Sequence, residues 1–307
     1  MADQDDHFRS PAYGGRKGYA IFHWWIRCLG VVPAYLLCAL ILPYYIIFRP
    51  SARRAAGPYL KHRYPTLSPI GRLIEMVRHY YAFGQVLIDQ AAMGVLGPAR
   101  FSVDFPGAAE LHHLAQERRG LVLLTSHIGN WQTAMANMGD LEVPVHFQLQ
   151  LQDHTEGHHF FDLAGEQRRF RIVSPRGFLG GMVELAGALQ AGECVAVMGD
   201  RAWGGKTQTA TFLGEPAQFP ITPYHLTVRT GSELVVLLTA RTGKCAYRIE
   251  HTRITDADVL TGMSRDEAVT ELMRRYVACL EDYVARYPRM WFNFFDFWSR
   301  SRENEPY

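Results

Sequence analysis

Cysteine and net charge are both scarce in this chain of 307 residues. The 5 cysteines are odd in number, widely spaced and form no C-x-x-C pair, which argues against a disulfide framework. We therefore expect free, buried thiols in a reducing compartment. The formal net charge is only +2, whereas a protein that binds nucleic acid in general needs a strongly basic face. No nucleic acid is therefore expected among the partners. The cysteines are Cys28, Cys38, Cys194, Cys245 and Cys279.

Three common sequence signals are also missing. The first 18 residues begin with acids rather than bases and lack a small-residue cleavage site, so we expect a polar tail and no secretory signal peptide. The G-x-S-x-G motif of serine hydrolases is absent, which disfavours a serine nucleophile. No internal repeat or low-complexity tract divides the chain, so a single domain over residues 49–307 is the economical organisation.

What the chain does have is a long apolar run near its beginning, Tyr19–Phe48. Its inner part, Val31–Phe48, has no charged residue and just meets the length of a membrane-spanning helix. Aromatic residues stand towards its two ends, as they do at membrane interfaces: Trp24, Trp25, Tyr44 and Tyr45. The alternative is a core helix buried in the globular domain. We predict a membrane-anchoring helix over residues 19–48, which either spans the bilayer or lies in its surface.

A basic cluster follows the apolar run directly. Arg49–Arg63 carries five Lys or Arg residues and no acid, and it is denser than the basic residues before the run. This asymmetry favours the cytoplasmic side for the downstream domain. The cluster is suited to anionic lipid or to an acidic carrier protein, and it is equally compatible with a solvated stretch beside the membrane.

The rest of the chain alternates between strand and helix patterns. Such alternation predicts an α/β fold with a mainly parallel central sheet flanked by helices, preceded by the membrane-associated apolar helix. A glycine-bearing loop is expected at Gly199–Pro220. The predicted helices are Ile70–Gly94, Ala108–Arg119, Trp131–Met138, Gly157–Arg169, Leu179–Gln190, Ile221–Thr230 and Arg265–Arg286, and the predicted strands are Phe101–Phe105, Leu121–Thr125, Val143–Leu149, Phe170–Val173, Cys194–Met198, Leu234–Ala240 and Cys245–His251.

The stretch Leu121–Ala134, LVLLTSHIGNWQTA, carries the main chemical signal. An apolar strand leads into a polar turn and then into a helix, for which Asn130 is a suitable N-cap. His127 therefore lies at the carboxyl end of a strand, where open α/β sheets collect their ligands. Because histidine titrates near neutral pH, His127 is a candidate general base. The alternative is a loop histidine that hydrogen-bonds its own backbone.

His127 and Gln132 form an H-x-x-x-x-Q pattern. In one regular helix, residues five apart point about 140° away from each other, so the two side chains meet only if His127 lies in the turn before the helix. A second set of histidines suggests metal binding, but nothing nearby completes a tetrahedral site, and we predict neither a metal nor a cofactor. That set consists of His154, His158 and His159 with Asp162.

The segment TSHIGNWQ resembles the catalytic block of the late acyltransferases of lipid A biosynthesis, within the lysophospholipid acyltransferase superfamily, which carry H-x-x-x-x-D/E. Further blocks follow in the family's order between residues 174 and 298: Ser174–Gly177, Val197–Gly205, Phe212–Gly214 with Phe219-Pro220, and Met290–Trp298. The last block, MWFNFFDFW, is suited to core packing more than to dipping into a membrane.

The resemblance implies transfer of a fatty acyl group from acyl-carrier protein or acyl-CoA to a hydroxyl or amine of a membrane lipid or glycolipid. It also implies a bacterial inner-membrane location with the catalytic domain on the cytoplasmic face. In this mechanism His127 takes the acceptor proton. The backbone N–H groups that follow Gly129, around Asn130, are placed to stabilise negative charge.

The resemblance also implies roles for three further charged residues. Asp200 and Arg201 stand where the superfamily places substrate contacts, although an acid beside an arginine is also typical of a surface ion pair. Arg176 is a candidate for contact with an anionic headgroup or a carrier phosphate, or it is structural.

Gln132 departs from the family, whose carboxylate orients the histidine and stabilises the imidazolium. An amide oxygen accepts a hydrogen bond but brings no charge. Three interpretations follow: the amide suffices because a thioester is reactive, another acid such as Asp200 supplies the charge, or catalysis is lost. The alternative functions are accordingly an acyl thioesterase or lipid hydrolase, and a catalytically silent lipid-binding protein.

Overall fold

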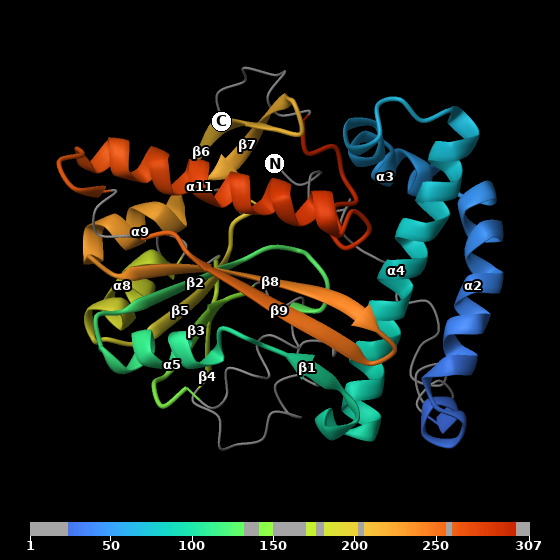
Figure 1. Ribbon diagram of the computed structural model, residues 1–307, viewed down its shortest axis with the longest axis horizontal. Helices are drawn as coiled ribbons and strands as arrows, with labels where there is room; N and C mark the ends of the chain where they lie inside the picture. Colours follow the sequence, from blue (N-terminus) through green and yellow to red (C-terminus); the bar gives the residue numbers. More distant parts are fainter. Residues whose placement is uncertain are drawn as a thin grey trace.

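The computed structural model describes residues 24–131, 141–149, 170–175, 181–201, 206–255 and 260–298. A seven-stranded sheet with the order β1-β9-β8-β2-β5-β3-β4 forms its centre (Figure 1). Neighbouring strands are parallel except for the β8–β9 hairpin. The predicted fold class, a mainly parallel α/β sheet, is confirmed. The strands are β1 (Ser102–Asp104), β2 (Leu121–Thr125), β3 (Val145–Gln148), β4 (Phe170–Val173), β5 (Cys194–Met198), β8 (Glu233–Gly243) and β9 (Ala246–Arg253).

Helices cover both faces of the sheet, which is why the central strands are apolar throughout. Every residue of β2 is buried. Because side chains alternate along a strand, Val122 and Leu124 of β2 pack with α8, α9 and α11, whereas Leu121 and Leu123 pack with α5 on the opposite face. These helices are α5 (Ala108–Gln116), α8 (Met182–Gln190), α9 (Thr222–Thr230) and α11 (Arg265–Arg286).

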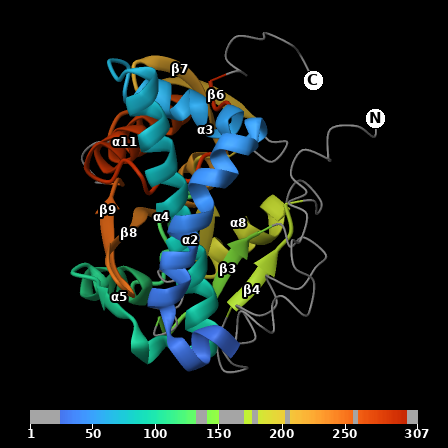
Figure 2. The same ribbon diagram turned by 90° about the vertical axis from the view of Figure 1, so that its right-hand side faces the viewer.

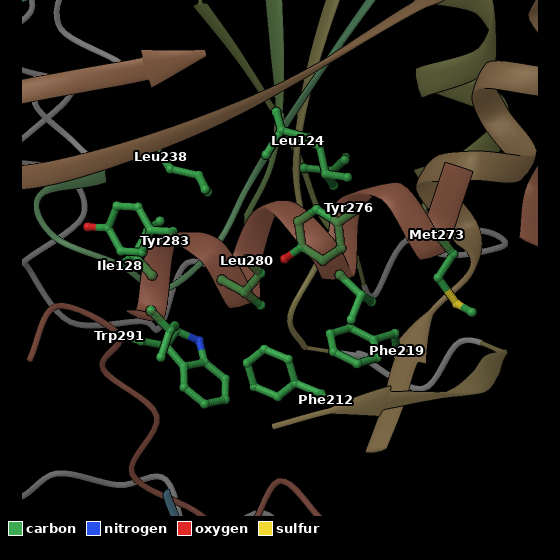
Figure 3. Close-up of a cluster of buried hydrophobic side chains, with 14 of the residues drawn as sticks. Leu124, Ile128, Phe212, Phe219, Leu238, Met273, Tyr276, Leu280, Tyr283 and Trp291 are labelled. Carbon is green, nitrogen blue, oxygen red and sulfur yellow. The ribbon is translucent and has the colours of Figure 1, made fainter. Parts of the chain in front are cut away.

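Helix α11 has the bounds that the sequence predicts. Its start is set by a capping box, in which Glu267 N–H donates to Ser264 Oγ at 3.3 Å and Ser264 N–H donates to Glu267 Oε2 at 2.8 Å. Tyr276, Leu280 and Tyr283 are buried along its inner side. Figure 3 shows these side chains between Leu124 and Leu238 of the sheet and the rings of Phe212, Phe219 and Trp291.

The prediction of a loop over Gly199–Pro220 was wrong for its second half. That part forms an antiparallel hairpin of β6 (Thr207–Phe212) and β7 (Glu215–Pro220). The turn places Leu213 at φ 52° and Gly214 at φ 83°, the left-handed pair typical of tight hairpins. The hairpin lies outside the main sheet, and the prolines within β7 obscure its strand pattern in the sequence.

The sheet is preceded by the helices α2 (Val31–Phe48), α3 (Pro50–Arg63) and α4 (Pro69–Leu96). Helices α2 and α4 lie side by side along one edge of the molecule, as Figures 1 and 2 show from two directions. Helix α2 has the length and composition needed to cross a membrane. The predicted anchoring helix also includes residues 19–23, which lie outside the described residues, as does the predicted polar tail.

All five cysteines are free, as predicted. The prediction that their thiols are buried holds for Cys194 but is wrong for Cys28, which is exposed. Cys28 belongs to a helical stretch at residues 24–29, before α2, where only one side of the chain meets the rest of the protein. Several predicted features fall outside the described residues: the helix at 157–169, the four metal-ligand candidates, Gln132 and Arg176.

Candidate active site

The pairing of β2 with β5 brings two distant turns together. The strands are parallel neighbours, with Thr125 opposite Met198. Both chains therefore leave the sheet at its carboxyl edge, and residues two positions further on, His127 and Asp200, come to lie beside each other. The backbone N–H of Gly199 donates to the carbonyl of Thr125 at 2.8 Å, which extends the pairing into the turns.

The side chains of His127 and Asp200 are hydrogen-bonded. His127 Nδ1 lies 2.9 Å from Asp200 Oδ1, and the backbone N–H of His127 donates to Asp200 Oδ2, also at 2.9 Å. Asp200 is 2% exposed, whereas the His127 side chain is 20% exposed. With the carboxylate ionised, Nδ1 carries the shared proton, so Nε2 is the nitrogen left to accept another.

Burial and charge set the protonation of this pair. Burial lowers the pKa of His127, the Asp200 charge opposes that effect, and the net direction is downward from 6.5. Burial alone would raise the pKa of Asp200, but the charges of His127 and Arg201 and the hydrogen bonds from His127 outweigh it and lower the pKa to about 2. At neutral pH the site therefore holds a neutral imidazole against an ionised carboxylate, the state that a general base requires.

Residues 290–298, here called the C-terminal strap, run along the His127 turn. The N–H of Gly129 donates to the carbonyl of Met290, and the N–H of Phe292 donates to the carbonyl of His127, both at 2.8 Å. Between these two bonds, Ile128 and Trp291 form an isolated antiparallel bridge. The strap thus holds the His127 turn through backbone hydrogen bonds on both sides of Ile128.

Trp291 also contacts the carboxylate directly. Its indole Nε1–H donates to Asp200 Oδ2 at 3.0 Å, so the carboxylate receives hydrogen bonds from three directions. Both Trp291 and Trp298 are buried in the main core, which confirms core packing as the role of the terminal aromatic block. Sequence reasoning missed the contact with Asp200. The one available signal is that a buried indole N–H needs an acceptor.

The turn after His127 is tightly enclosed. Gly129 has φ +49°, and a Cβ on it would lie 1.8 Å from the carbonyl oxygen of Thr239 in β8, so only glycine fits. Asn130 is fully buried, and its Oδ1 accepts a hydrogen bond from Gln90 Nε2 of α4 at 3.5 Å. Trp131, where the sequence predicts a helix to begin, is helical, and the rest of that predicted helix lies outside the described residues.

A contact between two buried hydroxyl groups fixes the start of the His127 turn. Ser126, which directly precedes His127, lies 2.7 Å from the Tyr276 hydroxyl of α11, and both side chains are buried. Gly199 packs on the same ring, because a Cβ there would lie 2.6 Å from Tyr276 Cζ. The backbone on which the His127–Asp200 pair is built is therefore held by β8, α11 and the C-terminal strap.

Of the remaining predicted site residues, the structure describes Arg201 but not Gln132 or Arg176. Arg201 donates through Nη2 to the carbonyl of Phe292 at 3.1 Å, and its guanidinium lies over the Phe295 ring, 5.2 Å from the centroid. It therefore joins the Asp200 turn to the C-terminal strap. Gln132 and Arg176 lie outside the described residues. Within the described residues, no group of three or more His, Cys, Asp or Glu side chains is arranged to hold a metal ion.

A buried carboxylate–histidine pair at the carboxyl edge of a mainly parallel sheet defines the class of this protein as an α/β protein with an enzyme-like site at the usual position for that architecture. The family model described as "Bacterial lipid A biosynthesis acyltransferase" matches residues 1–300, and the chain belongs to this family. It is accordingly an acyltransferase, and the resemblance seen in its motifs is confirmed. The family is typically membrane-associated in bacteria. No curated protein sequence matches the chain.

Proposed function

We propose that this protein transfers a fatty acyl group from an acyl thioester, acyl-carrier protein or acyl-CoA, to a hydroxyl or amine of a lipid or glycolipid. His127 is the general base and Asp200 is its charged partner. The observation that carries the proposal is the bond of 2.9 Å between His127 Nδ1 and a buried Asp200 carboxylate in a member of this family.

In this mechanism His127 Nε2 accepts the acceptor proton as the hydroxyl oxygen attacks the thioester carbonyl. The Asp200 carboxylate stabilises the imidazolium that forms. When the tetrahedral intermediate collapses, the carbon–sulfur bond breaks, and the departing thiolate takes the proton from His127. Because a thiolate leaves readily, deprotonation, alignment and oxyanion stabilisation are the main demands on the protein.

The oxyanion is assigned to the helix start that the sequence predicts at Trp131, because backbone N–H groups and the dipole of a helix favour negative charge at its N-terminus. The N–H of Gly129 does not contribute, because it donates to the carbonyl of Met290. The role of Gly129 is to let the turn pass close to β8.

Asp200 offers a physical account of the missing carboxylate at Gln132. An acid on Nδ1 orients the imidazole and balances its charge, so the residue five positions after His127 need not be charged. Of the three interpretations of Gln132, the geometry favours the one in which Asp200 supplies the charge. We assign Gln132 a secondary role in aligning the site, and we assign Asp200 to His127 rather than to the substrate.

Contacts with the substrates are proposed for Asn130, Arg176 and Arg201. Arg201 and Asn130 already bind the C-terminal strap and α4, so they shape the site from behind as well. Arg176 remains a candidate for an anionic headgroup or a carrier phosphate. We place the protein at the bacterial inner membrane with its catalytic domain on the cytoplasmic face, next to the basic helix α3.

The test is a transfer assay with four variants in vesicles that contain a lipid acceptor. We expect His127→Ala to lower the rate at least about a thousandfold. Asp200→Asn should lower it about a hundredfold or more, because the charge is lost and the shape is kept. Gln132→Ala and Gln132→Glu should each change it less than about tenfold. His113→Ala is the matched control, since that side chain is 75% exposed on α5 and its ion-pair partner is Glu117 rather than a residue of the site.

Each part of the proposal has an outcome that contradicts it. Full activity of His127→Ala would rule out the base, and full activity of Asp200→Asn would rule out its partner. Activity that appears only in Gln132→Glu would identify a silent lipid-binding protein. Release of free fatty acid without any dependence on acceptor would identify a thioesterase.

A further inference from the structure

Exposed apolar side chains gather on one side of the molecule. Among the described residues, 18 large hydrophobic side chains are exposed, and 11 of them lie between Trp24 and Phe48. Four more lie on α4, at Ile70, Leu73, Ile74 and Leu87. We call these 15 residues the apolar face. So many exposed apolar side chains on two helices that pack against each other are unusual for a protein in water, and they mark an interaction surface.

The opposite side of α2 is docked on the protein. The Tyr35 hydroxyl donates to the carboxylate of Asp89 on α4, and both residues are buried. Asp89 also accepts from Arg241 Nε at 2.9 Å and from the Tyr247 hydroxyl at 2.5 Å. These two residues belong to β8 and β9, so the network ties α2 to the central sheet through α4. The Arg241 guanidinium further lies over the Tyr35 ring, 5.1 Å from its centroid.

Close packing continues along α2 away from this network. One turn after Tyr35, Cys38 meets Gly84 of α4 so closely that a Cβ on Gly84 would lie 2.5 Å from Cys38 Sγ. Near the end of α2, Ile46 is fully buried in the main core. Helix α2 is therefore docked from its first residue, Val31, which is also buried, to its last turn.

This docking is incompatible with a helix that crosses the bilayer. Helix α2 is about 27 Å long, close to the full thickness of the hydrocarbon core. If it stood upright while docked, α4 and the neighbouring sheet edge would occupy the same depth (Figures 1 and 2). That region carries charges such as Arg78, 57% exposed, and the Arg248–Asp104 pair, 45% and 58% exposed. Charges at that depth in lipid are strongly disfavoured.

We propose that α2 stays docked and lies in the plane of the membrane, with the apolar face inserted into one leaflet of an anionic phospholipid bilayer. Helix α2 is apolar all round because α4 covers one side and lipid covers the other, so that helix and domain together form an amphipathic body. Exposed basic residues flank the face at Arg27 and Arg54, where they meet anionic headgroups. The proposal rests on the membrane attachment proposed above, and it decides between spanning and surface binding.

In this arrangement the membrane and the active site are joined through α4. The same helix presents Ile70, Leu73 and Leu87 to lipid and donates from Gln90 to Asn130, three residues after His127. The height of His127 above the leaflet is therefore set by one rigid helix, which suits an acceptor that stays anchored in that leaflet.

Cys28 provides a native probe of orientation, because it is exposed just before α2. The full chain, with the other four cysteines changed to alanine, is treated in bacterial spheroplasts with a membrane-impermeant maleimide. We expect Cys28 to be labelled only after lysis, because both ends of an in-plane helix face the cytoplasm. Ser51→Cys, exposed on α3, marks the domain side and should behave in the same way when Cys28 is also replaced. Labelling of Cys28 in intact spheroplasts would show a spanning helix and overturn the proposal.

Flotation with phosphatidylcholine–phosphatidylglycerol vesicles tests the apolar face itself. We expect Leu40→Arg, at a position 77% exposed at the centre of the face, to lower the bound fraction at least about tenfold. The matched control is Val183→Arg, 60% exposed on α8, which should bind as the wild type does. Equal binding of Leu40→Arg and wild type would overturn the proposed face. Absence of wild-type binding would instead contradict membrane attachment, whatever the labelling of Cys28.

Discussion

Three hydrogen-bond donors meet at the carboxylate of Asp200: the imidazole and the backbone N–H of His127, and the indole of Trp291. A buried carboxylate with this many donors stays ionised and does not need to move when charge develops on the imidazole. His127, by contrast, loses affinity for protons through burial. At the scale of single residues, the site therefore combines a base that is neutral at pH 7 with an acid that is charged.

The pH dependence of kcat/KM follows from these directions. A base must be neutral, so activity rises with pH through the pKa of His127, and we expect the acid limb below 6.5 because that pKa is lowered. The Asp200 charge raises the pKa of His127, so Asp200→Asn should move the acid limb to still lower pH while it lowers the plateau. Rate profiles between pH 4.5 and 8 measure both. An acid limb that moves to higher pH in Asp200→Asn would contradict the assigned pairing.

At the scale of elements, the site depends on two turns and one strap. The register of β2 with β5 sets the two turns level, and the C-terminal strap bonds to the first turn through Gly129 and Phe292. Arg201 bonds the second turn to the same strap. The strap is therefore part of the active site, although its Trp291 follows His127 by 164 residues in the sequence.

Trp291→Phe tests the strap's hold on the carboxylate. The variant keeps an aromatic ring in the core but removes the N–H that bonds Asp200, so we expect kcat to fall about tenfold, in line with a lost hydrogen bond to a charged group. KM should change little, and the acid limb should shift, because Asp200 is less well held.

Trp298→Phe is the matched control for this experiment. Trp298 is also buried, but its indole N–H donates to the carbonyl of Phe212, away from the pair. We expect a comparable loss of stability without any shift of the acid limb. Equal shifts in the two variants would show that Trp291 acts only through packing.

At the scale of the whole molecule, α4 joins the apolar face, the active site and the core. His79 on α4 is fully buried among aromatic rings, including those of Tyr59 and Phe294. Burial lowers its pKa to about 4, although the Glu75 carboxylate opposes the effect. The folded protein thus excludes a proton that the unfolded chain binds below pH 6.5.

Stability should consequently depend on His79 between pH 6.5 and 4. Above pH 6.5 the imidazole of His79 is neutral in both the folded and the unfolded state, so its titration does not change the free energy of unfolding there. As the pH falls from 6.5 to about 4 the unfolded state gains the proton first, and the free energy of unfolding should drop by roughly 3 kcal/mol at most. His79→Leu should remove this part of the pH dependence of the free energy of unfolding, which urea titrations at several pH values measure. An unchanged slope would contradict the assigned pKa.

Much of the fold could be predicted from local patterns. The apolar runs of β2 and β5, the amphipathic helix at Arg265–Arg286 and the β8–β9 hairpin all carry strong periodicity or turn signals. The β6–β7 hairpin could not, because β7 contains two prolines and the hairpin lies outside the main sheet. Among site residues, His127 could be found from its place after a strand, since that position is a local property.

By itself, the sequence determined the α/β class, the family, the apolar helix and His127 as the candidate base, because each rests on residues close together in the chain. Only the tertiary structure decided which acid meets His127, because β2 and β5 are 73 residues apart and no local pattern says that they are neighbours. The same holds for Trp291, and for α2, whose docking depends on the buried Asp89 network that joins four separate elements.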